Sequence, residues 1–236
     1  MAKNASPSES ARPGPARSLD LERVVDTAVA LLDEGGSSAL SVRAVAGRLG
    51  IQPNAIYTYV ADRAALERAV VERVLSLADV GLLAGPARSW RRRLTDYASA
   101  LRGVLLDHPG AAVLFMSAPM DGPSALFVGE GLVGLFMDAG LSPDDASRAT
   151  YTVIVHVLGS VALEVAETDG RPPLAPESDR ARDRYALLTQ VPADVFPLSA
   201  ATARTAAEWV TTAQFAWDLG LLLDGVAARA KARRRE

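Results

Sequence analysis

A tight turn between two short helical segments constrains this chain more than any other feature of its sequence. The turn lies at Gly50, inside the stretch LSVRAVAGRLGIQPNAIYTYVADR at residues 40–63. Ser41 can cap the first segment, because its hydroxyl can accept a hydrogen bond from a free backbone N–H group of the next turn. Gly50 can take the left-handed conformation that ends a helix, and Pro53 suits the first turn of the next helix. The pattern therefore predicts a helix-turn-helix arrangement.

The outward face of this arrangement favours DNA binding over a purely structural role. Its polar side chains carry amide, phenol and guanidinium groups, which suit contacts with base edges and phosphates. These side chains are Arg43, Asn54, Tyr57, Tyr59 and Arg63. An ordinary helical hairpin in a bundle would show the same apolar spacing but would give these groups no role. We therefore interpret the second helix as one that reads the major groove.

The remaining sequence predicts helices and no strands, so we expect an all-α fold. Residues 1–17 are rich in Pro and Ser and are expected to form a disordered arm. A helix capped by Asp20 and ended by Gly35-Gly36 should complete a three-helix DNA-binding unit. We divide the chain into the arm at 1–17, the DNA-binding domain at 18–65 and a helical domain for ligand binding and dimerisation at 66–236.

Helical patterns in the second domain are interrupted by Pro-rich stretches. Ser124 and Ser142 are the expected caps of two of its helices. The segment at 111–118 is apolar on nearly all sides and should be buried all round. The expected helices span residues 63–79, 89–108, 111–118, 124–139, 142–167, 180–188 and 202–233, with a loop at 168–178 and an irregular stretch at 191–199.

Composition excludes several classes of protein. The chain has no cysteine, so it has neither disulfides nor thiolate metal sites. Its net charge of −3 argues against a general polyanion binder, although residues 229–236 carry five basic groups and one acidic group. The start shows no signal-peptide pattern and no run of eighteen apolar residues occurs, so we expect a cytoplasmic protein without membrane contact.

Motifs for catalysis or cofactor binding lack the structural context that would give them meaning. Residues 129–134, GEGLVG, fit the dinucleotide pattern GxGxxG, but they lie inside a helical apolar repeat and not between a strand and a helix. The two histidines are 48 positions apart, and neither HExxH nor GxSxG occurs. We expect no catalytic residues, no metal and no cofactor.

Several short motifs together resemble the TetR family of transcriptional repressors. The similarity covers residues 19–79 well, through Ser41-Val42-Arg43, Leu49-Gly50-Ile51 and Ile56-Tyr57. It continues more loosely through residues 139–142, 157–159 and 215–229, which resemble the tetracycline-repressor type of C-terminal domain. The resemblance implies a homodimer that binds a palindromic DNA operator and leaves it when a small molecule fills the C-terminal core.

The resemblance also implies which residues contact DNA. Arg43 and the second helix match the base- and backbone-contacting surface of the family, and Tyr59 and Arg63 match phosphate-contacting positions. Val42 departs from the pattern, since a hydroxyl residue there often touches phosphate. Tyr57 can also be interpreted as a half-buried structural aromatic. The expected DNA-binding residues are Ser41, Arg43, Gln52, Pro53, Asn54, Ala55, Tyr57, Tyr59 and Arg63.

The resemblance also suggests an effector other than tetracycline. Polar positions that hold a metal-chelated tetracycline become Tyr97, Leu114 and Leu132 here, so the ligands for a chelated Mg²⁺ complex are lost. A largely apolar molecule would suit the expected ligand-binding residues, although aromatic and Met side chains at helical spacing are often only core, and a lone His is often an interior or interface group. These residues are Tyr97, Leu101, Leu105, Met116, Ser117, Phe127, Phe136, Tyr151, Ile154 and His156.

Two long helices are expected to form the dimer interface, because their apolar faces are too extensive for the surface of a monomer. They span residues 142–167 and 215–229. Three hypotheses follow. The first is a dimeric repressor released by a small molecule, the second a DNA-binding regulator without such an inducer, and the third a helical enzyme or ligand carrier that keeps the three-helix module only as structure.

Overall fold

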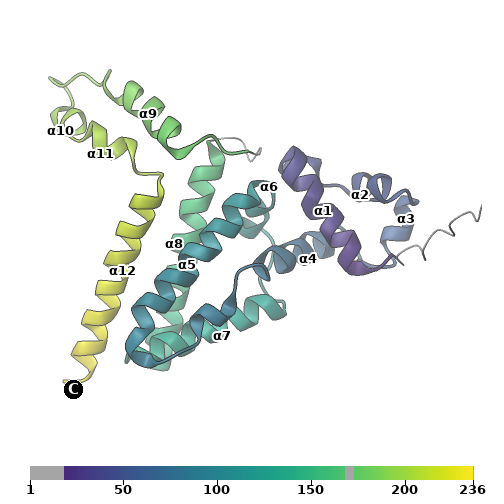
Figure 1. Ribbon diagram of the computed structural model, residues 1–236, viewed down its shortest axis with the longest axis horizontal. Helices are drawn as coiled ribbons and strands as arrows, with labels where there is room; N and C mark the ends of the chain where they lie inside the picture. The colour runs from purple at the N-terminus through teal and green to yellow at the C-terminus, as the bar shows by residue number, and fades with distance from the viewer. Residues whose placement is uncertain (1–18, 168–172, 236) are drawn as a thin grey trace, which may run out of the picture.

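The computed structural model describes residues 19–167 and 173–235, and within these ranges it contains helices and no strands (Figure 1). The predicted all-α class is therefore confirmed. The predicted arm at 1–17 and part of the predicted loop, residues 168–172, lie outside the described residues. The α-helices are α1 (Leu21–Gly35), α2 (Val42–Leu49), α3 (Pro53–Ile56), α4 (Arg63–Leu75), α5 (Trp90–Asp107), α6 (Pro109–Ala112), α7 (Pro123–Asp138), α8 (Pro143–Ala166), α9 (Glu177–Leu188), α10 (Pro197–Ala201), α11 (Ala203–Ala207) and α12 (Thr212–Arg233). Short 3₁₀ helices are η1 (Ser37–Ala39), η2 (Val80–Leu83), η3 (Ala87–Ser89) and η4 (Val113–Met116).

Helices α1, α2 and α3 form a unit at one end of the molecule (Figure 1). We call residues 19–62 the reader unit and residues 76–235 the body. Asp20 caps α1 by accepting a hydrogen bond from the Arg23 N–H group at 2.9 Å, and Gly36 ends this helix with a φ of 71°. Leu32, Val45 and Ile56 are fully buried in the reader unit. The three-helix arrangement expected from the sequence is therefore present.

Helix α4 connects the reader unit to the body. Asp62 caps it by accepting a hydrogen bond from the Ala65 N–H group at 2.8 Å. α4 contacts α1 in the reader unit and contacts α5 and α7 in the body, and Val70, Val71 and Val74 are fully buried between them. The apolar core therefore continues through α4 from one part of the molecule to the other, and the domain boundary after residue 65 stays a prediction.

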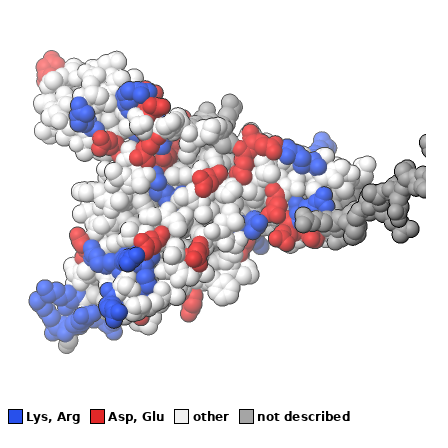
Figure 2. Space-filling view, viewed as in Figure 1, with Lys and Arg blue, Asp and Glu red and all other residues white. Residues whose placement is uncertain are grey.

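The body is built around α5, α7 and α8, with α12 running alongside α8 (Figure 1). Its largest fully buried side chains include Tyr97, Leu105 and Phe136. Basic side chains gather at the C-terminal end of α12, at the opposite end from the reader unit (Figure 2). Lys231 and Arg235 there are exposed.

Helices α9, α10 and α11 form an arm that projects from the upper end of α8 and α12 in Figure 1. Its root is ionic. Arg102 of α5 pairs with Glu164 of α8 at 2.5 Å, and Arg180 of α9 pairs with Glu164 and, at 2.8 Å, with Glu167. Arg102, Glu164 and Arg180 are all buried. A buried charge is costly unless it is paired. The ion pairs of Arg180 with Glu164 and Glu167 therefore hold α9 against α8.

Three predicted helices differ from those observed. The single helix predicted at 202–233 is wrong, because the chain breaks after α11 and Thr211 starts α12 as a new cap, accepting from the Gln214 N–H group at 3.3 Å. The helix predicted to reach residue 79 ends at Leu75. The segment at 111–118 is not buried all round, since Val113 is 41% and Met116 59% exposed.

Smaller differences concern helix starts. Ser124 does not cap α7, which starts at Pro123 after Gly122; the Glu72 carboxylate accepts the free N–H groups instead. α9 starts at Glu177, before the predicted residue 180, and the stretch predicted as irregular contains the start of α10. Ser142 does cap α8 as predicted, by accepting from the Asp145 N–H group.

Candidate functional site

The turn between α2 and α3 has the geometry that its sequence predicts. The Ser41 hydroxyl accepts a hydrogen bond from the Ala44 N–H group at 3.0 Å, which starts α2. Gly50 ends α2 in the left-handed region with a φ of 70°. Pro53 starts α3, which is only four residues long. Ile56, fully buried, anchors α3 against the core of the reader unit and so fixes which of its side chains face outward.

Predicted DNA contacts of α2 and α3 lie on this outward surface. Arg43, Gln52, Asn54 and Tyr57 are exposed, Tyr57 by 51%, and Ser41, Pro53 and Ala55 are half-buried beside them. Among the described residues none pairs with the Arg43 guanidinium. A free guanidinium next to amide and phenol groups can donate to base edges and phosphates without first breaking an internal contact.

Tyr59 and Arg63 are both engaged within the protein. The Tyr59 hydroxyl donates a hydrogen bond to the Leu19 carbonyl at 3.1 Å, and its ring is half-buried against the core. Arg63 is the first residue of α4 and its Nε lies 2.7 Å from a carboxylate oxygen of Glu67, although its side chain stays 61% exposed. Tyr59 therefore has a structural role that its sequence position did not indicate, and a phosphate contact by either residue stays a prediction.

One ion pair joins α1 and α2 within the reader unit and has no local sequence pattern. Arg48 of α2 binds Glu34 of α1 through two hydrogen bonds, of 2.9 and 2.5 Å. These hydrogen bonds from Arg48 hold the pKa of Glu34 below its ordinary value. The two residues are 14 positions apart, so only the folded structure brings them together. They hold α2, and with it Arg43, in place on α1.

Four of the predicted ligand-binding residues share the apolar core of the body. They are Tyr97, Leu101 and Leu105 of α5 and Phe136 of α7, all of them buried. The Tyr97 hydroxyl is buried and has no hydrogen-bond partner among the described residues, and burial raises the pKa of this phenol. A buried hydroxyl without a partner is unusual, because burying an unpaired polar group costs free energy. Among the predicted ligand-binding residues with a hydrogen-bonding group, which are Tyr97, Ser117, Tyr151 and His156, only Tyr97 is buried.

Of the other six predicted ligand-binding residues, Ile154 packs against this core from a half-buried position, and the other five lie outside it. Phe127 of α7 is 68% and Tyr151 of α8 71% exposed, so a cavity enclosed by all ten residues is not formed. Met116 and Ser117 lie at the end of η4, where Met116 is 59% exposed. Phe127 was predicted as a pocket residue because α7 is apolar on most sides. The sequence alone did not show which face of α7 points inward.

His156 and Ile154 of α8 differ from the outward-facing residues of the same helix. The His156 ring stacks on Phe215 of α12, with ring centroids 4.8 Å apart and planes inclined by 12°. Its Nε2 also lies 3.3 Å from the Phe215 carbonyl oxygen. Ile154 is half-buried and packs against the core. His156 therefore joins α8 to α12, in line with its alternative interpretation as an interior or interface group.

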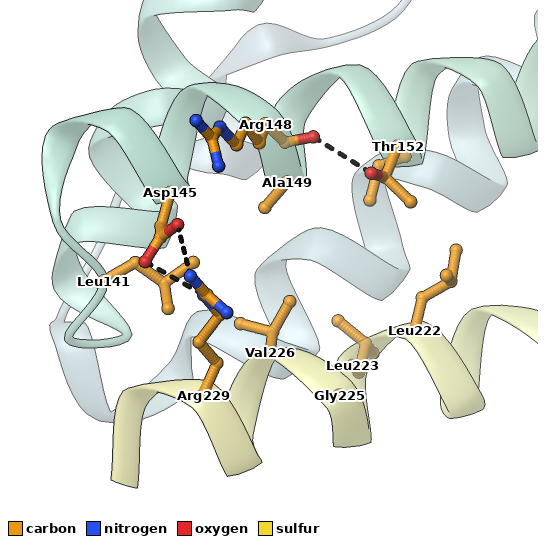
Figure 3. A pocket seen from close by; sticks show the side chains of 11 residues that line it. Leu141, Asp145, Arg148, Ala149, Thr152, Leu222, Leu223, Gly225, Val226 and Arg229 are labelled. Carbon is orange, nitrogen blue, oxygen red and sulfur yellow. Dashed lines mark hydrogen bonds and ion pairs between the residues drawn. The ribbon is translucent and has the colours of Figure 1, made fainter. Parts of the chain in front are cut away.

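Helices α8 and α12 leave a groove of about 300 Å³ between them (Figure 3). Leu141, Ala149 and Val226 line it, and an ion pair between Asp145 and Arg229, at 2.9 Å, closes one end. The hydrogen bond from Arg229 lowers the pKa of Asp145. Large apolar side chains are exposed on the same two helices: Tyr151, Val155 and Leu163 on α8, and Trp217 and Leu221 on α12.

Helix α8 is long and apolar enough, by length and composition, to cross a membrane, with a mean hydropathy of 1.6 over its most apolar window. A core helix of a globular protein passes the same test, and α8 contacts α5, α7 and α12 here. Only 33% of that window is buried within one copy of the chain.

Within the described ranges, no group of three or more His, Cys, Asp or Glu side chains could hold a metal ion.

Two regions of the chain match known protein families. Residues 24–70 match the family described as bacterial regulatory proteins, tetR family, and residues 84–230 match the family described as tetracyclin repressor-like, C-terminal domain. An HTH-type transcriptional regulator from Saccharopolyspora erythraea is 34% identical over 146 residues, which make up 62% of this chain and 61% of that protein. The chain thus spans less than two thirds of the length of this relative.

Solved structures resemble the whole described fold. A possible TetR family transcriptional regulator from Streptomyces coelicolor A3(2) is 32% identical, with a TM-score of 0.74 over 89% of this chain and 99% of that one. The Streptomyces coelicolor TetR family protein ActR, in complex with (S)-DNPA, has a TM-score of 0.76 at 23% identity, over 89% of this chain and 98% of that one. The ActR similarity concerns the fold alone, whereas the first covers sequence and fold together.

Proposed function

Because the chain belongs to the TetR family of transcriptional regulators, we propose that it is a repressor that binds an inverted-repeat operator as a homodimer and is released by a small, largely apolar molecule. Members of this family bind DNA and are not enzymes, so the alternative of a helical enzyme or carrier is set aside. The exposed, unpaired surface of α2 and α3 carries the proposal. Such a protein acts where DNA is, in the cytoplasm, and no membrane partner is proposed.

In the proposed complex, α3 lies in the major groove of the operator. Gln52, Asn54 and Tyr57 face the base edges, and Arg43 donates to a guanine or to a neighbouring phosphate. Two reader units would enter grooves about 34–36 Å apart, or a multiple of that distance, because one turn of DNA separates successive half-sites. The operator is therefore an inverted repeat with a fixed spacing.

The proposed dimer buries the outward faces of α8 and α12. Tyr151, Val155, Trp217 and Leu221 are exposed in one copy, on the same two helices that line the groove in Figure 3. Isolated exposed apolar residues are ordinary on a protein surface, but several large ones on two packed helices favour an interface. A second copy related by a twofold axis would present the same surface and cover it.

The proposed effector binds in the core beside Tyr97. The phenol is buried without a partner among the described residues, so a ligand that accepts its hydrogen bond would regain the free energy lost by burying it. Leu114 and Leu132 are buried where a chelated metal complex would need polar ligands, which favours an apolar molecule with an acceptor group. ActR, which shares this fold, forms a complex with the small molecule (S)-DNPA, and the proposal extends that property of ActR to the present chain.

Selection of random double-stranded DNA by the purified protein tests the proposal, at one stated salt concentration because affinity depends strongly on salt. We expect an inverted repeat to be enriched and to provide the probe for a ligand screen. Enrichment of no sequence, before and after denaturing and refolding to remove bound small molecules, would contradict DNA binding. An enriched operator that no compound releases would favour the regulator without an inducer.

Arg43→Ala is the sharpest variant for the proposed docking. We expect it to weaken operator binding by about 1–3 kcal/mol and to relax the preference at one base pair, because a bidentate guanidinium contact is lost. Electrophoretic or fluorescence titrations with substituted operators measure both effects. Arg88→Ala, which removes an exposed guanidinium from the body, is the matched control and should leave the base preference unchanged. Equal effects of the two variants would contradict the assigned orientation.

A further inference from the structure

Helix α4 carries two neighbouring side chains that bind opposite parts of the molecule. Arg73 reaches the reader unit, where its Nε lies 2.7 Å from a carboxylate oxygen of Asp26 on α1. Glu72 reaches the body, where its carboxylate accepts hydrogen bonds from the backbone N–H groups of Ser124, at 2.7 Å, and of Ala125, at 3.3 Å. These residues therefore lie where the reader unit and the body meet.

The Glu72 carboxylate replaces the missing cap of α7. The first N–H groups of a helix have no partner within it, and the N-cap position of α7 is occupied by Gly122, which has no side chain to offer. A carboxylate at the start of a 16-residue helix is also favoured by the helix dipole. The cap thus comes from a residue 52 positions before Ser124, on a different helix.

The contact between Glu72 and α7 leaves no room for a side chain at Gly122. A Cβ atom added at Gly122 would lie 2.3 Å from Glu72 Cδ and 2.5 Å from Glu72 Oε1. Any side chain there would therefore displace the carboxylate from the N-terminus of α7. A weaker exposed contact runs parallel to it, with Arg68 Nε 3.4 Å from Asp121 Oδ1.

We propose that Glu72 is the positioning residue through which the body sets the orientation of the reader unit. The proposal rests on the proposed function: α7 packs against α5, which carries Tyr97, and buries Leu132 and Phe136, so a molecule bound beside Tyr97 would displace α7. Because Glu72 fastens α4 to the first turn of α7, this displacement passes to α4 and changes the spacing of the two α3 helices. Only a ligand that binds the two arrangements with different affinity shifts the equilibrium between them.

Two variants break the contact from opposite sides. Glu72→Ala removes the carboxylate. Gly122→Ala leaves the carboxylate on Glu72 but places a methyl group where it binds α7. Each has a matched control: Glu67→Gln, which removes an acid of α4 that pairs with Arg63, and Gly129→Ala, at an α7 glycine with open space around it. Thermal unfolding identifies any variant that does not fold, and the other variant of the pair then carries the test.

A distance within one chain provides a readout that needs neither operator nor dimer. The chain has no cysteine, so Glu22→Cys in α1 and Glu130→Cys in α7, both exposed, take spin labels at these two positions only. Labelled chains are diluted with unlabelled protein. We expect one distance population in the parent protein and both controls, and a broadened or second population in Glu72→Ala and Gly122→Ala. An unchanged distribution in both variants would overturn the proposal.

The second readout separates spacing from the fold of the reader unit. We expect affinity for the complete inverted repeat to fall on the order of fivefold in both variants, as for the loss of one helix cap, while affinity for a single half-site stays unchanged. Equal loss on both DNAs, or no loss on either, would overturn the proposal. If the parent protein selects no inverted repeat, the proposed function fails, and the distance measurement alone decides the role of Glu72.

Discussion

Two tyrosines with the same chemistry occupy opposite situations in this protein. The Tyr59 hydroxyl donates to the Leu19 carbonyl and ties the start of the described chain to the reader unit. The Tyr97 hydroxyl is buried in the body and finds no partner among the described residues. We expect the first phenol to contribute to stability and the second to lower it, and only the second is a proposed ligand contact. The difference decides what the loss of each oxygen atom should do.

We expect Tyr97→Phe to leave the free energy of unfolding unchanged or to raise it by about 1 kcal/mol, because an unpaired buried hydroxyl is removed. Tyr59→Phe, the matched change, should lower it by about 1 kcal/mol through the lost hydrogen bond. Urea unfolding followed by circular dichroism measures both. If an effector is found, Tyr97→Phe should also weaken its release of the operator. A clear destabilisation by Tyr97→Phe would mean that the hydroxyl has a partner in the folded protein.

At the scale of an element, α2 and its C-terminal cap contain two glycines that differ in backbone conformation alone. Gly47 is helical and Gly50 is left-handed, with a φ of 70°, and a Cβ atom would meet no other atom within 4 Å at either position. New contacts of an added methyl group therefore cannot explain a difference in stability between alanine substitutions at the two sites. The pair isolates the conformational requirement of the turn that positions α3.

Gly47→Ala should stabilise the protein by about 0.5–1 kcal/mol, because alanine has the higher helix propensity. Gly50→Ala should destabilise it by about 1 kcal/mol, because an L-residue is strained in the left-handed region. Thermal unfolding of the two variants, measured side by side, gives the sign of each effect. Stabilisation by both substitutions would contradict the left-handed turn.

Elements with strong terminal signals could be predicted closely, and those capped by distant residues could not. α8 follows from Ser142 and Pro143 alone, and the reader unit from Asp20, Ser41 and Gly50, because these caps act on their own neighbours. The start of α7 depends on Glu72, and no local pattern announces that contact. The break before α12 was missed because Trp209 and Val210 continue the apolar spacing through it.

Site residues followed the same division. The outward face of α2 and α3 could be read from the sequence, since the buried residues of two short helices leave only one free face. Which of the proposed ligand-binding residues lie in the core could be predicted only in part, because α7 and α8 are apolar on most sides. Periodicity there does not tell a core position such as Phe136 from an exposed one such as Phe127.

On the scale of the whole molecule, the reader unit and α12 lie far apart, with α5, α7 and α8 between them (Figure 1). The surface proposed for DNA recognition and the surface proposed for self-association are therefore separate. Arg43 lies on the first surface, and Trp217 and Leu221 lie on the second. A change on one of them should leave the other intact, so the two properties can be tested independently.

Leu221→Asp should convert the proposed dimer to a monomer, because it places a charge in an apolar interface where it has no partner. Sedimentation velocity measures the change in mass. Leu126→Asp, at a similarly exposed apolar residue on α7, is the control and should leave the mass unchanged. A parent protein that sediments as a monomer at micromolar concentration would contradict the interface on α8 and α12.

If the proposed dimer forms through the apolar faces of α8 and α12, the stability of this protein depends on its concentration in the cell. A face completed only by a second copy contributes its free energy by mass action, so dilution lowers the temperature at which the chain unfolds. At low abundance the chain would not only leave its operator but also spend more time open to proteases. Dosage and lifetime are then linked: a scarce copy is also a short-lived one.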